Sequence, residues 1–103
     1  MRMTFEQFRA TLTGNEPPHD LSSELRALWH DARGDWNAAH QVAQDIDSQS
    51  GSLIHAYLHR KEGDLSNASY WYRRAGRSVV KDSLEEEWKR LVNEELKISG
   101  LEI

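Results

Sequence analysis

Two histidines and a glutamate recur at helical spacing in the middle of the chain. His55, His59 and Glu62 stand at positions i, i+4 and i+7, so a helix would place all three side chains in one narrow sector. Imidazole and carboxylate groups are ligands that bind divalent transition metals. The spacing therefore predicts a candidate metal site at His55, His59 and Glu62. The alternative is a structural role, in which a partly buried histidine forms a hydrogen bond with a backbone carbonyl, an aspartate or a tyrosine.

A second cluster combines arginines with aromatic residues at YWYRRAG, with HRK upstream. Arginine makes forked hydrogen bonds to carboxylate or phosphate, and adjacent aromatic rings supply a wall that excludes water. A small anion or an acidic peptide would suit such a surface. The alternative is that these arginines pair with the acidic flanks of the chain, for instance with Glu85 to Glu87 or Asp31.

The polar residues of both clusters are too numerous to be explained by packing alone. Buried arginines must be paired and buried histidines must be bonded, so a group that is only partly satisfied is prepared for a ligand. We therefore expect these side chains to border a cleft. The candidate ligand-binding residues are His55, Tyr57, His59, Arg60, Arg73 and Arg74.

Nucleophilic catalysis has little support in the sequence. The chain has no cysteine, and no serine stands in a Gly-x-Ser-x-Gly elbow. Gly34 and Gly63 are isolated, so no phosphate-binding loop is predicted. The sequence favours a binding protein over an enzyme, and a divalent metal is the one cofactor that it suggests.

The charges of the chain are segregated. Residues 51–81 carry six Lys and Arg against two acidic residues, whereas both flanks are acidic and the net charge is -4. Proteins that bind nucleic acids usually have a basic domain, so that class is disfavoured. No apolar run resembles a signal peptide or approaches the length of a membrane span. We therefore expect a cytoplasmic protein that binds neither nucleic acid nor membrane.

The elements that must position these residues are helices. Apolar residues recur at helical period in every segment between the breakers TGNEPPHD, QSGS and AGRSVVKDS, and no convincing strand pattern is present. The sequence predicts one all-α domain over residues 1–103. The expected core includes Trp36, Ala39, Ala56, Ala68, Tyr72 and Trp88.

The chain contains an internal repeat. A shift of 29 residues lays LRALWHDARGDWNAA over IHAYLHRKEGDLSNA, so that His30 meets His59 and two Gly-Asp pairs coincide. Glycine can end one helix and aspartate can cap the next. The repeat predicts two helical hairpins. If the hairpins stack with pseudo-symmetry, His30 and His40 could approach His55 and His59, which would favour a metal.

The two repeat units cover residues 20–48 and 50–77 and are expected to join near Ser50 to Ser52. Two units are fewer than the three that a solenoid normally needs. Capping helices over residues 4–12 and 83–98 would cover the ends and give a compact right-handed bundle. Dimerisation could also close residual apolar surface, so a monomer and a homodimer both fit.

The second unit resembles the tetratricopeptide repeat. It has a small residue midway in the first helix, a Gly-Asp turn, and an alanine, an aromatic residue and an alanine in the second helix. The matching residues are Ala56, Gly63, Asp64, Ala68, Tyr72 and Ala75. The first unit matches in part, and the period of 29 is shorter than the 34 residues usual in that family.

The resemblance implies a protein- or peptide-binding module, which would need an exposed groove lined by Tyr57, Arg60 and Lys61. The alternative is a protein that binds a small ligand, an anion or a metal through the His, Arg and Tyr cluster of the second repeat. The pattern HAYLHRKEGD with YWYRRAG also resembles a family of short, uncharacterised bacterial proteins, and that resemblance implies no activity.

Overall fold

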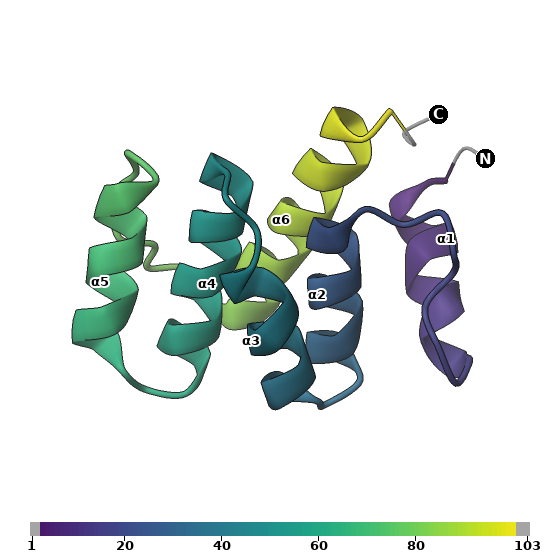
Figure 1. Ribbon diagram of the computed structural model, residues 1–103, viewed down its shortest axis with the longest axis horizontal. Coiled ribbons are helices and arrows are strands. Elements are labelled where there is room, and N and C mark those ends of the chain that lie inside the picture. Colours follow the sequence, from purple (N-terminus) through teal and green to yellow (C-terminus); the bar gives the residue numbers. More distant parts are fainter. Residues whose placement is uncertain (1–2, 101–103) are drawn as a thin grey trace.

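The computed structural model describes residues 3–100, and the regular elements in that range are all helices (Figure 1). The all-α prediction is therefore confirmed. No helix in this range is both long enough and apolar enough to cross a membrane. The elements are α1 (Phe5–Ala10), the 3-10 turn η1 (Thr11–Thr13), α2 (Ser23–Ala32), α3 (Trp36–Gln44), α4 (Gln49–Lys61), α5 (Leu65–Arg74) and α6 (Leu84–Ile98).

Short polar side chains define the helix starts. The hydroxyls of Ser22, Ser48 and Ser83 accept hydrogen bonds from backbone N–H groups in the first turns of α2, α4 and α6. The carboxylates of Asp35 and Asp64 do the same for α3 and α5. Each cap satisfies an N–H group that has no partner within its helix.

The two Gly-Asp turns, between α2 and α3 and between α4 and α5, have the same conformation. Each begins with a glycine in the left-handed region, with φ of 83° at Gly34 and 89° at Gly63. The aspartate that follows donates its N–H to the carbonyl five residues earlier, at 3.0 Å in the first turn and 2.9 Å in the second. This bond closes the preceding helix. The two turns therefore correspond at the shift of 29 residues.

The connection between the two helix pairs differs from the prediction. QSGS, expected as a break, forms the first turn of α4, and residues 45–48 make the connection instead. A Cβ atom added at Gly51 would lie 2.5 Å from the carbonyl oxygen of Ile46. Gly51 therefore permits a close approach between α4 and the preceding loop and does not mark a helix end.

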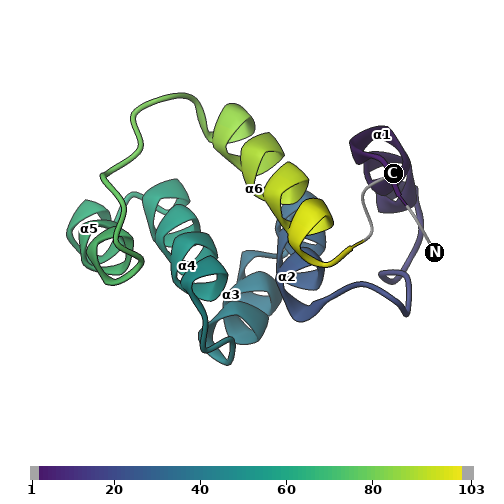
Figure 2. The ribbon, with the colours of Figure 1, turned by 90° about the horizontal axis from the view of Figure 1, so that it is seen from above.

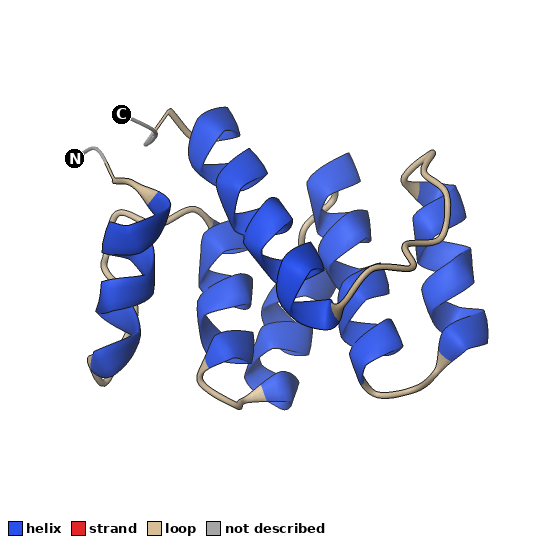
Figure 3. Cartoon of the chain, turned by 180° about the vertical axis from the view of Figure 1, so that it is seen from behind, coloured by secondary structure: helices blue, strands red, loops and turns tan. Residues whose placement is uncertain are grey.

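Helix α4 is the central element of the fold. Its residues from Gly51 to His59 are all buried, because α4 packs against α2, α3, α5 and α6. Helix α6 runs along α2 and α4 on the side away from α3 (Figure 2), and the view from behind shows its oblique course (Figure 3). Helix α4 therefore contacts α3 with one face and α6 with another.

The predicted core is confirmed at its three alanines and at Tyr72, whereas its two tryptophans are more exposed. Ala39, Ala56, Ala68 and Tyr72 are buried, whereas Trp36 and Trp88 are partly buried. The indole of Trp36 donates to the carbonyl of Leu58 at 2.8 Å, and that of Trp88 donates to the carbonyl of Leu28 at 3.0 Å. Each ring thus packs at a helix interface while its N–H group finds a partner.

Candidate functional site

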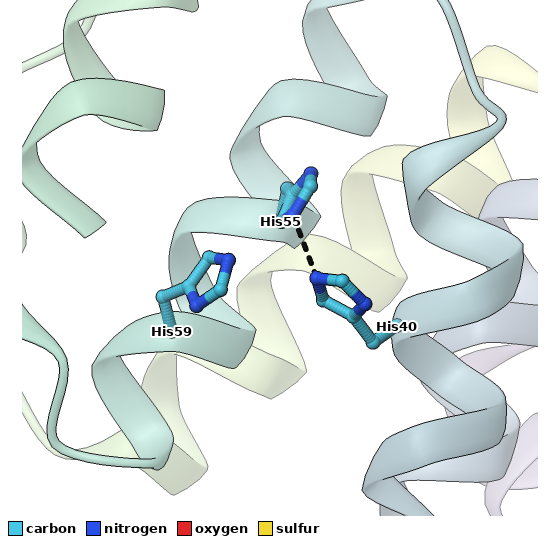
Figure 4. Close-up of side chains that lie close together, drawn as sticks. All are labelled: His40, His55 and His59. Atoms are coloured by element: carbon cyan, nitrogen blue, oxygen red, sulfur yellow. Dashed lines mark hydrogen bonds between the residues drawn. The ribbon is translucent and has the colours of Figure 1, made fainter. Parts of the chain in front are cut away.

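Three histidines converge between α3 and α4 (Figure 4). The Nε2 atoms of His40 and His55 are 2.9 Å apart. One ring nitrogen from each of His40, His55 and His59 lies within 4.8 Å of the other two. His55 and His59 are buried and His40 is half-buried. Three imidazoles from two helices can therefore serve a single ion.

Tryptophans of α3 and α5 hold two of these rings in place. The ring of His40 stacks on Trp36 of α3, with centroids 4.9 Å apart and an interplanar angle of 12°. The ring of His55 stacks on Trp71 of α5 at 4.0 Å and 16°, and on His59 at 4.8 Å and 20°. Stacking on this scale restricts rotation of the imidazoles, so the site is preorganised.

Glu62 orients a histidine of the cluster. Its Oε2 lies 2.7 Å from Nδ1 of His59, which fixes the hydrogen on Nδ1 and leaves Nε2 as the free acceptor. Carboxylates in this position are typical partners of metal-binding histidines. Glu62 was expected as a third ligand beside His55 and His59, whereas in this cluster His40 is the third converging group. A second, more exposed group consists of His59, Glu62 and Asp64, whose possible ligand atoms also lie within 4.8 Å of one another.

His30, the counterpart of His59 in the repeat, does not join the cluster. Its ring lies edge-on to Trp29, with centroids 5.3 Å apart. Of the four histidines that stacking of the hairpins could have brought together, the structure brings three.

The surroundings keep two of the imidazoles neutral. Burial, with the neighbouring His40 and His59 acting in the same direction, lowers the pKa of His55 to about 4. Burial also lowers the pKa of His40, with His59 acting in the same direction and Glu62 against it. Neutral imidazole is the form that binds a metal, so at neutral pH these two rings need not lose a proton first.

Tyr57 and Arg60 belong to the other face of α4. The hydroxyl of Tyr57 donates to Asp31 at 2.8 Å. One guanidinium nitrogen of Arg60 donates to Glu87 at 2.6 Å, and the other donates to the carbonyl of Asp82. For Arg60 the structure thus shows the internal pairing with an acidic flank that was the alternative to ligand binding.

This second face forms a buried polar network. Asp31 and Glu87 are each 2% exposed. Asp31 also accepts from Lys61 at 2.9 Å, and Glu87 also accepts from Tyr72 at 2.5 Å. Burial, together with the adjacent carboxylates, raises the pKa of Tyr57 and Tyr72. The peptide groove expected here is not open, because Tyr57 is buried and the network joins α4 to α2 and α6.

A pocket of about 290 Å³ adjoins the histidine cluster where α3, α4 and α5 meet. Its walls include His55, Trp71 and Arg74. The guanidinium carbon of Arg74 lies 5.4 Å from the ring centroid of Trp71. Arg73 lines a neighbouring depression that it shares with Arg74. The predicted residues therefore divide: His55, His59 and Arg74 lie at the cluster or its pocket, and Tyr57 and Arg60 do not.

These side chains form two separate groups, one of converging imidazoles and one of paired charges. The charges are fully engaged with one another, since no buried side-chain nitrogen or oxygen among the described residues lacks a hydrogen-bond partner. The imidazoles, by contrast, present ring nitrogens to a common centre. No protein-family model, curated protein or solved structure matches this chain.

Proposed function

We propose that this protein binds a divalent transition metal through His40, His55 and His59. The observation that carries the proposal is the spacing of their ring nitrogens, all within 4.8 Å of one another. Nitrogen ligands lie about 2.0–2.1 Å from zinc, so tetrahedral ligands are about 3.4 Å apart. Small rotations of the histidine side chains would bring the ring nitrogens from the observed spacing to the tetrahedral spacing.

The chemistry of the ligand set narrows the choice of metal. An all-imidazole set without thiolate suits Zn²⁺, Ni²⁺ or Cu²⁺ and suits Mg²⁺ or Ca²⁺ poorly. Three protein ligands leave a coordination position for water or for a small molecule. The bond between His59 and Glu62 supports the proposal, because it directs the free nitrogen of the imidazole.

Titration calorimetry of chelator-treated protein with Zn²⁺ and Ni²⁺ tests the proposal. Wild type is expected to bind one ion per chain, and His40→Ala and His59→Ala are expected to weaken binding at least tenfold. His30→Ala is the matched control, since His30 occupies the equivalent place in the first repeat. Absence of binding by wild type, or an equal loss in His30→Ala, would contradict the proposal. Circular dichroism checks that each variant is folded.

We also propose that the pairs α2–α3 and α4–α5 are tetratricopeptide-like units stacked in a right-handed sense. The equal conformations of the two Gly-Asp turns support this arrangement. An experimental structure tests it. Residues 23–44 should superpose on residues 52–73 at the shift of 29, and any other register would exclude it.

Binding of a protein or an acidic peptide is the second proposed function. The observation in its favour is the exposure of two large side chains on α5, Leu65 at 64% and Tyr70 at 46%. The Tyr70 hydroxyl lies 3.4 Å from the guanidinium of Arg74. A fluorescent acidic peptide should bind wild type and His40→Ala equally, and should bind the double variant Arg73→Gln/Arg74→Gln more weakly. Binding that requires His40 would instead favour the metal site.

A further inference from the structure

We propose that the metal bound at this site takes a small oxyanion, a carboxylate or a phosphate, which bridges the ion and the guanidinium of Arg74. This inference rests on the proposed function. It specifies the class of ligand that fills the position left open by His40, His55 and His59.

The charge of the ligand set is the first argument. Three neutral imidazoles leave the two positive charges of the ion uncompensated. Glu62 acts on the ion only through His59, and His55 and His59 are 6% and 7% exposed. A charge in so buried a place is costly unless it is paired. An anion in the open position supplies that pairing.

The pocket beside His55 is the second argument. Its volume of about 290 Å³ lies at the lower limit for drug-sized ligands and leaves room for a small ion. Gln44 and Ser52 provide neutral polar groups in its walls. Asp47 also lines the pocket, and its negative charge disfavours ligands that carry many negative charges.

The position of Arg74 is the third argument. Its guanidinium lies over Trp71, and Trp71 stacks on His55. The same tryptophan therefore holds both the metal ligand and the cation beside one pocket. Among the ion pairs of residues 3–100, none involves Arg74, and its one side-chain hydrogen bond, to the Tyr70 hydroxyl, is long at 3.4 Å. Its forked donors are free to bind the oxygens of a carboxylate or a phosphate.

Cobalt-loaded protein provides the test, because the visible absorption of Co²⁺ reports on its ligands. Wild type loaded with Co²⁺ is titrated at constant ionic strength with inorganic phosphate and, separately, with malonate. A saturable spectral change is expected with at least one of the two probes. The probe that binds more tightly identifies whether the oxyanion is a phosphate or a carboxylate. Arg74→Gln should weaken anion binding at least tenfold and leave Co²⁺ affinity within twofold of wild type. Arg73→Gln, the neighbouring arginine outside this pocket, should behave as wild type.

Results that differ from these expectations would each contradict one part of the proposal: the oxyanion, the bridging arrangement, the role of Arg74 or the metal site. If Co²⁺ binds and neither anion changes its spectrum, the oxyanion proposal is wrong and the metal site stands. If calorimetry shows equal anion binding by the metal-free protein, the bridging arrangement is wrong. Anion affinity unchanged in Arg74→Gln removes Arg74 from the site. If wild type does not bind Co²⁺, the proposed function fails first.

Discussion

His40 and His55 place their Nε2 atoms 2.9 Å apart across the interface of α3 and α4. This contact requires that one nitrogen carry a hydrogen and that the other accept it. Two protonated rings would present two donors to each other and would repel. The contact is therefore sensitive to the protonation of these two rings.

The metal-free protein is expected to lose stability as the pH falls from about 6.5 to about 4. Burial lowers the pKa of His55 from 6.5 to about 4, so in this range the unfolded chain binds a proton that the folded chain excludes. The free energy of unfolding should fall by an amount of the order of 3 kcal/mol from this group. Urea unfolding at a series of pH values measures the loss.

His55→Phe is the control for this pH dependence, because phenylalanine keeps the stacking on Trp71 and cannot be protonated. The charged and titratable groups around His55 are His40, His59, Glu62, Asp47 and Arg74, and all of them remain in the variant. Its stability should vary less with pH over this range. An identical slope in wild type and variant would show that His55 is not the responsible group.

Glu62→Ala is expected to lower metal affinity by about 10–100-fold, as loss of an outer partner typically does. Without the carboxylate, His59 can rotate and can place its hydrogen on either nitrogen. Glu85→Ala removes an equal charge from an exposed position on α6 and should leave the affinity unchanged. Calorimetry with Zn²⁺ compares the two, and equal losses would indicate a general effect of charge.

Arg60→Ala is expected to destabilise the protein by about 3–5 kcal/mol, because it leaves Glu87 buried without its cation. Addition of Glu87→Gln should recover part of the loss, since the uncompensated charge is then removed. Arg90→Ala, which breaks a more exposed pair with Asp82, should cost much less. Similar unfolding free energies for Arg60→Ala and Arg90→Ala would argue against a buried network.

Ala56→Leu is expected to lower the melting temperature. Ala56 is 0% exposed on the central helix, and extra methyl groups in a packed interior typically cost about 1–3 kcal/mol. Ala32→Leu makes the same change at an exposed position and should have little effect. A melting temperature for Ala56→Leu equal to that of wild type would mean that α4 has space at this point.

Glu95→Gln is expected to stabilise the protein at pH 7. Burial raises the pKa of Glu95, so folding disfavours its ionised form relative to the unfolded chain. At a pH below the range in which carboxyl groups titrate, both side chains are neutral and the difference should disappear. Glu94→Gln, on the neighbouring and less buried residue, provides the comparison in thermal melts at both pH values.

Local signals made much of the fold predictable. The Gly-Asp turns depend on residues close in sequence, and they were identified correctly. QSGS was misread, because Gly51 could equally end a helix or allow a close contact. Its role depends on Ile46, whose position follows from how the loop packs.

The candidate site was predictable only along one helix. The spacing of His55 and His59 places them together wherever α4 forms, whereas His40 arrives from α3 and depends on helix packing. The same limit applies to Arg60. Its sequence neighbours suggested a ligand, and its partner Glu87 lies 27 residues further along the chain.

The place of α6 at the end of the described chain affects how the protein is made. During translation, α2 to α5 leave the ribosome before α6 does. Until then, Arg60, Tyr72 and the carbonyl of Leu28 lack the partners that Glu87 and Trp88 later provide. The nascent chain exposes an incomplete polar network beside apolar surface during this interval. A chain whose synthesis stops before α6 would keep that surface open, and it is such surfaces that chaperones and quality-control proteases recognise.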